Sequence, residues 1–441
     1  MHLVFAIADI KMFRASLISA ITAILVMAVN FLVSVVTARS LGPEGRGAFY
    51  SVQVFALFVA SCAQLGLGQA MVYAVRAKIV NFRVAYDTSS AVTTALSVCM
   101  AIAAFSFFLK EETTEIWMAA CYAAAVSLTV FCGFCAQLES SLKAYNTARL
   151  ALPVLVLLSL AAVAATDSMN LSAAIAIQAL ATLLVASGTW AYLRWKLRRT
   201  HDESISAKDT KPPGAGTSLV KLGLKFHATT LAGILATNID KIYLISKAAA
   251  SELGIYSIAF STSRILSSLY ESMATSLYSR YGGHSDPGST DVVVQVFRAT
   301  FIPMMALAIL GGFIGQVFIP LVFGHKFSGA AIPFAILLIE SILSGSSWML
   351  AQKFNIDGKP GLVAIRQIAS IAPILIAMPF LPHQNLISWL AFVMAISGGV
   401  RLGLTIFFMM KMEKSSLRDL TPTISESMAL INKFRRKGSF E

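Results

Sequence analysis

Apolar stretches of about 20 residues recur from one end of the chain to the other, separated by short polar breaks. No extended alternation of apolar and polar positions predicts a barrel. Helices satisfy their own backbone hydrogen bonds, as a lipid environment requires. The pattern therefore predicts an all-α membrane protein with spans near residues 15–37, 49–72, 89–109, 116–137, 150–166, 171–193, 222–246, 254–278, 299–320, 330–351, 361–380 and 386–410.

The composition agrees with burial in lipid rather than in water. Hydrophobic residues make up 57% of the chain and charged residues 13%, whereas a soluble domain has about 25% charged residues. The net charge of +13 would indicate nucleic acid in a soluble protein. Here most Lys and Arg fall in the tails and in alternate loops, which predicts cytoplasmic termini and no nucleic-acid partner. The opposite loops hold Arg39, Arg46, Lys110, Lys247 and Lys326.

A hydrophilic, basic stretch divides the twelve predicted helices into two sets of six. We predict an N-terminal lobe over 1–193, a basic cytoplasmic linker over 194–221, a C-terminal lobe over 222–410 and a cytoplasmic tail over 411–441. The linker's basic residues are suited to anionic headgroups of membrane lipids. The first span is too long for a signal peptide, so we expect it to be retained.

The two lobes resemble each other at a constant offset. Thr22 aligns with Thr230, Asn30 with Asn238, Arg39 with Lys247, and Glu44 with Glu252. Gly47 and Gly254, which follow the two glutamates, are expected at tight turns or helix starts. Two like six-helix bundles around a central cavity form a plan typical of transporters that alternate access by rocking.

The motifs at these positions resemble those of the polysaccharide-transport flippases, the Wzx type of the MATE-like MOP superfamily. The resemblance spans nearly the whole chain, although each motif is short. It rests on Ala38-Arg39-Ser40-Leu41-Gly42-Pro43-Glu44-Gly45-Arg46-Gly47, Asn238-Ile239-Asp240-Lys241, Ser251-Glu252-Leu253-Gly254-Ile255-Tyr256-Ser257 and Val322-Phe323-Gly324-His325-Lys326-Phe327.

This resemblance implies a flippase of the bacterial inner membrane. Such proteins move an undecaprenyl-pyrophosphate-linked oligosaccharide from the cytoplasmic to the periplasmic leaflet for O-antigen or exopolysaccharide synthesis. Relatives that flip the peptidoglycan precursor usually have fourteen helices, so twelve favour the O-antigen or exopolysaccharide branch. The implied partners are the lipid-linked oligosaccharide, a polysaccharide polymerase and glycosyltransferases.

Charged residues inside predicted helices are candidates for the transport site, because a charge at membrane depth usually faces a cavity or a partner. Six such residues sum to zero charge: Asp240, Lys241, Arg264, Glu271, Glu340 and Arg401. Arg401 is expected to snorkel to the cytoplasmic surface. The eighth predicted helix carries a polar stripe at helical spacing: Ser257, Ser261, Arg264, Ser268, Glu271 and Thr275. The second helix carries a weaker one: Gln53, Ser61, Gln64 and Gly68.

We hypothesise that Arg264, together with Lys241, attracts the pyrophosphate, since a guanidinium matches phosphate oxygens. The alternative is an internal salt bridge from Arg264 to Glu340, Glu271 or Asp240. Hydroxyl and amide side chains would meet the sugars, although the two asparagines are equally suited to bridging helices. These candidates are Ser261, Ser268, Asn30, Asn238, Gln53 and Gln64.

The acids Glu340, Asp240 and Glu271 are candidates for coupling transport to protons or sodium, since burial raises the pKa of an unpaired carboxyl. Structural ion pairing is the alternative for each of them. Asp240 and Lys241 are neighbours on a helix, so we expect them to point in different directions and to have separate partners.

Two other functions compete with lipid flipping. A multidrug exporter of the same superfamily needs aromatic and acidic groups for cationic drugs, which the Arg-bearing helix does not favour. A membrane polymerase or ligase needs a large periplasmic loop, and every loop predicted there is short. No metal or nucleotide motif is present, and Cys132 and Cys135 are expected to pack within a helix. We therefore expect no enzyme activity, cofactor or metal.

Overall fold

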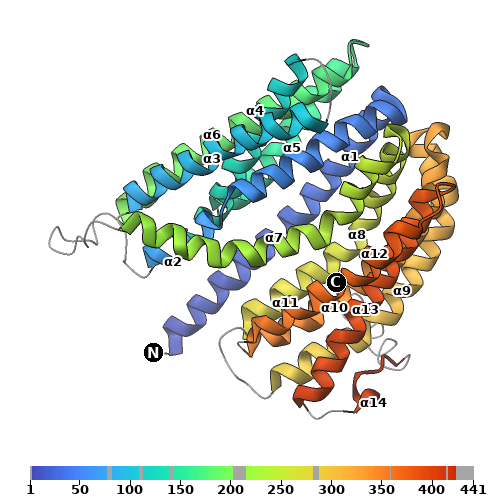
Figure 1. Cartoon of the computed structure of the whole chain (residues 1–441). Helices are drawn as coiled ribbons and strands as arrows, with labels where there is room; N and C mark the ends of the chain where they lie inside the picture. The colour runs from blue at the N-terminus through green and yellow to red at the C-terminus, as the bar shows by residue number, and fades with distance from the viewer. Residues whose placement is uncertain are drawn as a thin grey trace, which may run out of the picture. The chain divides into compact units, whose positions relative to one another are not determined.

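A computed structural model describes residues 2–76, 82–108, 113–139, 143–201, 215–281, 288–357, 359–413 and 416–423 (Figure 1). All regular elements in these ranges are helices, so the prediction of an all-α chain is confirmed. They are α1 (His2–Ala63), α2 (Leu67–Arg76), α3 (Phe82–Phe108), α4 (Thr113–Cys135), η1 (Ala136–Leu138), α5 (Lys143–Ala164), α6 (Leu171–His201), α7 (Ala215–Lys247), α8 (Ala250–Tyr281), α9 (Gly288–Phe323), η2 (His325–Ala330), α10 (Ala331–Ile356), α11 (Pro360–Ala369), α12 (Ala372–Ala377), η3 (Met378–Phe380), α13 (Leu386–Glu413) and α14 (Leu417–Leu420).

Helix α1 is a hairpin of two arms that supplies the first two predicted spans. It is broken at Gly42 (φ 68°, ψ −178°), directly before Pro43. Beyond the break, Arg46 donates hydrogen bonds to Thr37 (2.9 Å) and Ser34 (3.3 Å). Residues 34 and 46 would be about 18 Å apart along a straight helix. The chain therefore reverses at Gly42 (Figure 1), so the turn precedes the expected Gly47, which lies within the second arm.

Nine helices within the described residues are long and apolar enough to cross a membrane. One of them, Ile21–Ala63, contains both arms of α1. Helices α7 and α8 have 33 and 32 residues, which is ample for a span. They fall outside the apolar set, and α8 carries the polar stripe seen in the sequence. Two spans from α1 together with α7 and α8 account for all twelve predicted segments.

The chain forms two compact units, residues Met1–Ile242 and Tyr243–Glu441. The boundary between these units lies near the end of α7. Helix α7 begins against the first unit, where the backbone of Gly223 closely approaches Gly66 in the turn between α1 and α2. The lobes over 1–193 and 222–410 stay a prediction. Residues 202–214 of the linker and the end of the tail lie outside the described residues.

The first unit is held by aromatic packing and by ion pairs at helix ends. Tyr86 on α3 stacks on Phe82 and on Trp190 of α6, with ring centroids 5.2 and 5.9 Å apart. Its hydroxyl donates to the Trp190 carbonyl (3.0 Å). One turn further along α6, Arg194 forms a two-pronged ion pair with Asp87, both contacts being 2.7 Å. These contacts fix the ends of α3 and α6 to each other.

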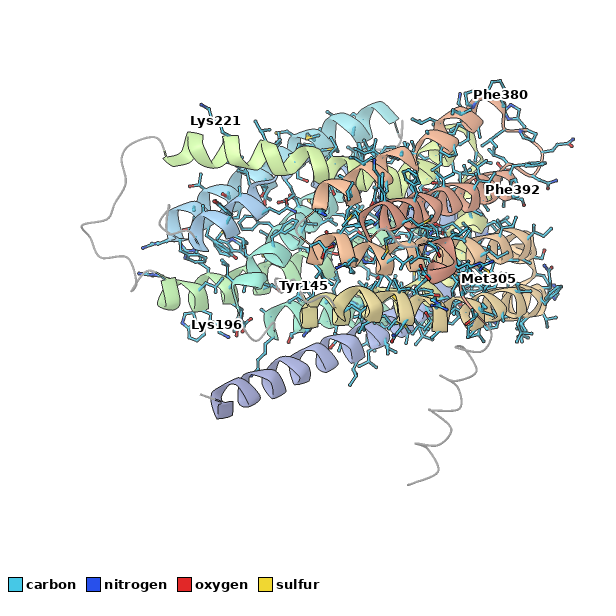
Figure 2. All side chains as sticks on the ribbon, turned by 90° about the horizontal axis from the view of Figure 1, so that it is seen from below. Tyr145, Lys196, Lys221, Met305, Phe380 and Phe392 are labelled. Atoms are coloured by element: carbon cyan, nitrogen blue, oxygen red, sulfur yellow. The ribbon has the colours of Figure 1, made fainter. Side chains whose placement is uncertain are left out.

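Helix α10 is the core of the second unit and packs against α8, α9 and α13. The outer faces of this unit are apolar. Phe313 and Phe380 are 74% and 83% exposed, and Phe380 and Phe392 lie on the outside of their helices in Figure 2. Large apolar surfaces of this kind do not persist in water, which agrees with a chain surrounded by lipid.

We predict that Gly66→Ala strongly destabilises the protein. Gly66 has φ +66°, and a Cβ there would clash with the Gly223 carbonyl. The left-handed conformation alone costs Ala about 1–2 kcal/mol. The thermal midpoint of the detergent-solubilised protein, followed by gel filtration, measures the loss.

Gly188→Ala on α6 is the matched control, because a Cβ at Gly188 meets nothing within 4 Å. Its midpoint should stay the same or rise, since Ala favours a helix over Gly by about 0.5–1 kcal/mol. Equal midpoints for the two variants would show that the contact between the turn and α7 is wrong.

Candidate functional site

The polar stripe on α8 is largely satisfied within its own helix. The hydroxyls of Ser257, Ser261 and Ser268 donate to carbonyls three residues earlier, at 2.8, 3.3 and 2.6 Å. Such bonds are the usual way for a membrane helix to carry serine. Glu271 lies on the exposed surface, and the side chain of Thr275 lies outside the described residues. Arg264, another member of the stripe, reaches a neighbouring helix.

Arg264 forms an ion pair with Glu340 of α10, with 2.7 Å between Nη2 and Oε2. The side chain of Glu340 is 3% exposed and that of Arg264 is 30% exposed. The guanidinium also lies over the ring of Phe260, 4.3 Å from its centroid. Of the two possibilities left open by the sequence, the salt bridge is therefore present, and part of Arg264 remains accessible.

A single hydroxyl joins this ion pair to Arg401 of α13. Ser344 donates from Oγ to Oε1 of Glu340 (2.6 Å). Arg401 donates from Nη1 to Ser344 Oγ (3.5 Å) and from Nε to Ser370 Oγ (3.1 Å). The expectation that Arg401 snorkels to the surface is wrong, because these hydroxyls hold its head group inside the unit.

A third cation, Arg366 of α11, was missed by the analysis of the sequence. It is fully buried and donates from Nη1 to Ser347 (2.7 Å) and Thr405 (3.4 Å). Its Nε and Nη2 have no hydrogen-bond partner among the described residues. Its place inside the predicted span 361–380 was the available signal, but it was grouped with the cytoplasmic cations.

These residues, Arg264, Arg366, Arg401 and Glu340, are called here the arginine cluster. It holds three cations and one carboxylate, a local excess of positive charge to which Arg366, absent from the six residues named from the sequence, contributes. An excess of buried positive charge is costly unless an anion compensates it. The arginine cluster is therefore suited to an anionic group.

Lys241 and Asn238, two other candidates from the second half of the sequence, make hydrogen bonds along their own helix. Lys241 lies 3.3 Å from Oδ1 of its neighbour Asp240 and donates to the Thr237 carbonyl (2.6 Å). The prediction that the two residues point apart is wrong, because the flexible lysine stem folds back along α7. Asn238 also donates within α7, to the Ile234 carbonyl (3.0 Å).

In the first unit, Gln64 links helices instead of lining a cavity. Its Nε2 donates to the carbonyl (2.7 Å) and the hydroxyl (3.2 Å) of Ser127 on α4. Gln64 is 3% exposed. It therefore ties the end of α1 to α4, the bridging role that amides commonly have between membrane helices.

Asn30 and Gln53, by contrast, both line one pocket of about 340 Å³ inside the first unit. The two arms of α1, with α4, η1, α5 and α6, form its walls. Tyr145, labelled in Figure 2, and Arg149 bring an aromatic ring and a cation from α5. The lining is Val26, Asn30, Val33, Gln53, Thr129, Cys132, Gly133, Ala136, Tyr145, Ala148, Arg149, Leu152, Pro153, Val156, Gln178, Val185, Ala186 and Thr189.

Arg149 is not among the candidates from the sequence, because it directly precedes the predicted span 150–166, where a cation is typical of the membrane surface. Cys132 and Cys135 are buried free thiols, and Cys135 packs 3.5 Å from the Met71 sulfur. Within the described residues, no group of three or more His, Cys, Asp or Glu is placed to hold a metal ion.

Comparison with known proteins identifies the family. The sequence profile described as "Polysaccharide biosynthesis protein" matches residues 13–278, which is more than half of the chain. The chain belongs to this polysaccharide biosynthesis family. No match is found among curated proteins.

Solved structures place this member of the polysaccharide biosynthesis family in the fold of MATE-like transporters. "Lipid II flippase MurJ, inward closed conformation" is 12% identical, with 98% of this chain and 93% of that chain covered and a TM-score of 0.71. An outward-facing "multidrug resistance MATE family transporter of the MOP superfamily" is 15% identical, with 91% and 97% covered and a TM-score of 0.60. A mutant of the Vibrio cholerae MATE transporter VcmN is 12% identical, with 93% and 98% covered and a TM-score of 0.60.

We predict that Arg366→Met keeps or raises stability but lowers transport. Replacing a buried, poorly compensated cation with an apolar side chain of similar length is neutral or stabilising by about 1–4 kcal/mol. A cation that serves an anionic substrate would nevertheless be lost. The thermal midpoint and glycan export in a deletion strain are measured together.

Lys353→Met is the control. Lys353 is also buried, but it forms an ion pair with Asp357 at 2.8 Å, so its removal leaves a carboxylate without its cation and should lower the midpoint. If Arg366→Met lowers the thermal midpoint as much as Lys353→Met does, groups of the protein itself compensate the charge of Arg366. The arginine cluster would then not be an anion site.

Proposed function

We propose that this protein is a flippase that moves an undecaprenyl-pyrophosphate-linked oligosaccharide across the inner membrane by alternating access, for O-antigen or exopolysaccharide synthesis. The polysaccharide biosynthesis family and the MATE-like fold support a lipid-linked substrate. The observation that carries the proposal is the arginine cluster, whose excess positive charge suits a diphosphate. A cavity between the two lobes stays a prediction.

Within this proposal Arg264 is the first contact of the pyrophosphate. It is the most exposed partner of its ion pair, and its planar donor fork matches two phosphate oxygens. Phosphate would compete with Glu340 for Arg264. Arg401 is placed to compensate Glu340 through Ser344 when Arg264 is engaged.

The other candidate residues divide into ligand-binding and structural groups. Asn30 and Gln53 keep the sugar-binding role, because they line a pocket. Gln64, Ser261, Ser268 and Asn238 are assigned to structure, because their donors are used within the helices. Lys241 joins this group through its contact with Asp240.

Coupling to protons or sodium remains part of the proposal, with Glu340, Asp240 and Glu271 as candidates. Two of these acids have a cation within 3.3 Å or less, so ion binding at either would require that cation to be displaced. Transport in proteoliposomes that is indifferent to pH and sodium gradients would remove coupling altogether.

We also propose cytoplasmic termini and, as partners, a polysaccharide polymerase and glycosyltransferases. The loop distribution of Lys and Arg supports this orientation. A phosphatase fused to the C-terminus should be inactive, and a fluorescent protein fused there should be bright. The opposite result would reverse the orientation.

The second candidate function is a cation-coupled multidrug exporter, which the resemblance to MATE structures favours. Cationic drugs need carboxylates, and none is present among the residues that line the pocket of the first unit. A polymerase or ligase is less consistent with the family and the fold, which indicate a membrane transporter.

We predict that deleting the gene abolishes export of the surface glycan and leaves drug susceptibility unchanged. Glycan export is measured by labelling the polysaccharide on intact cells, and susceptibility by growth with cationic drugs. Restored export from a plasmid copy is the positive control. Hypersensitivity with normal glycan would instead identify a drug exporter.

A charge swap separates the two roles of Arg264. The double variant Arg264→Glu, Glu340→Arg should keep the ion pair and its stability, yet lower export at least about tenfold, because an acid then occupies the accessible position. Each single variant is the control and should be less stable than the swap. Full export by the double variant would mean that the ion pair has only a structural role.

A further inference from the structure

The pocket of the first unit is built from one compact unit alone. Its lining runs from Val26 to Thr189, and the unit includes all these residues. At about 340 Å³ it lies near the lower end for small-molecule sites, which span about 300–1,000 Å³. Its size suits one small polar unit rather than a whole oligosaccharide.

Several polar groups in the wall are already satisfied by the protein. Thr129 donates to the Ala125 carbonyl (2.8 Å), and Thr189 donates to the Val185 carbonyl (2.7 Å). Gln178 hydrogen-bonds the Tyr122 side chain. These three residues shape the wall and leave few donors for a ligand.

Four other polar side chains in the wall are not satisfied in this way. Asn30, Gln53, Tyr145 and Arg149 make no hydrogen bond to the described residues. Arg149 contacts Tyr145 only through its ring, at 5.9 Å from the centroid. Asn30 and Arg149 are exposed and Gln53 and Tyr145 are half-buried, so their polar groups are open to a ligand that enters the pocket. Their convergence on one cavity indicates a ligand that pairs with them.

A proline inside α5 adds an acceptor to this set. Pro153 lies inside α5 and has no backbone N–H, so the carbonyl four residues earlier, that of Arg149, loses its usual helical partner. The pocket therefore combines donors from Arg149 with amide groups that both donate and accept. Such a mixture suits hydroxyl groups, which also do both.

The charge of the wall defines the ligand further. Arg149 is a cation, and no carboxylate lines the pocket. A cationic ligand is therefore disfavoured, and a negative group would pair with the guanidinium. The apolar part of the wall, which includes Val33, Leu152 and Val156, suits the C–H faces of a sugar ring.

We propose that this pocket is a subsite for one sugar residue of the transported glycan that lies beside an anionic group. Asn30 and Gln53 bind its hydroxyls, and Arg149 pairs with the anion, which is a carboxylate on the sugar or a phosphate of the carrier. This inference rests on the proposed function and names the part of the glycan that the protein selects.

The test uses the full-length protein in nanodiscs and three soluble probes: methyl glucuronide, methyl glucoside and inorganic pyrophosphate. Saturation-transfer NMR measures their binding and their mutual competition. We expect methyl glucuronide to bind more tightly than methyl glucoside. A charge-assisted bond of about 1.5–3 kcal/mol corresponds to a difference of about tenfold or more.

Three variants assign the binding to the pocket. Arg149→Met should reduce glucuronide affinity about tenfold, to that of the glucoside. Gln53→Leu should weaken both sugars, because it removes a hydroxyl partner. Thr129→Val is the matched control in the same wall and should change neither, since its hydroxyl serves its own helix. Gel filtration confirms that each variant is folded.

The outcomes distinguish a sugar carboxylate from a carrier phosphate as the anion. They also distinguish failure of the subsite from failure of the proposed flippase function. Pyrophosphate that binds and is lost in Arg149→Met, without glucuronide binding, assigns the anion to the carrier. Sugar binding that is equal in wild type, Arg149→Met and Gln53→Leu, or absent for all three probes, overturns the subsite. Binding as expected in a protein whose deletion leaves glycan export normal would keep the subsite and reject the flippase function.

Discussion

The structure depends on one constraint: in a membrane interior, polar groups must find partners within the chain, because lipid offers none. Most of the polar residues obey it locally. The serines of α8 bond to their own helix, Lys241 folds back onto Asp240, and Gln64 reaches the adjacent α4. Two nitrogens of Arg366 are among the buried side-chain atoms that have no hydrogen-bond partner in the described residues. The amides and the cation of the first-unit pocket likewise make no hydrogen bond to the described residues and are open to a ligand.

Helix breaks and a proline determine where these groups lie. The reversal at Gly42 brings the two arms of α1 together, so that Asn30 from one arm and Gln53 from the other line a single pocket. Pro153, which lines the same pocket, removes one hydrogen bond from the continuous helix α5. In the second unit, the break between α11 and α12 ends α11 at Ser370, whose hydroxyl then receives Arg401. Irregular backbone in this protein thus accompanies its polar sites, as is expected where lipid cannot satisfy exposed carbonyls.

The sequence was sufficient for the fold and for part of the site. Apolar runs predicted the long helices, including α7 and α8, which are less apolar than the others, because hydropathy depends on composition over about 20 residues and not on side-chain direction. The pairing of Arg264 with Glu340 was one of several alternatives, since spacing along one helix cannot show which neighbour faces it. Arg366 and Arg149 were missed for a different reason: both lie near helix ends, where a cation at the membrane surface and a buried one look alike in sequence. The contact of Lys241 with Asp240 was not predicted, because four methylene groups allow the lysine side chain to leave the direction set by its Cα–Cβ bond.

Ser344 has a consequence for how α10 and α13 communicate. A hydroxyl has one proton, and this one points at Glu340, so the same oxygen offers only its lone pairs to Arg401. Without this hydroxyl, Glu340 and Arg401 would lose the one group that both of them contact here, and α10 and α13 would lose a polar link between them. The register of the two helices is thus tied to the position of one small side chain.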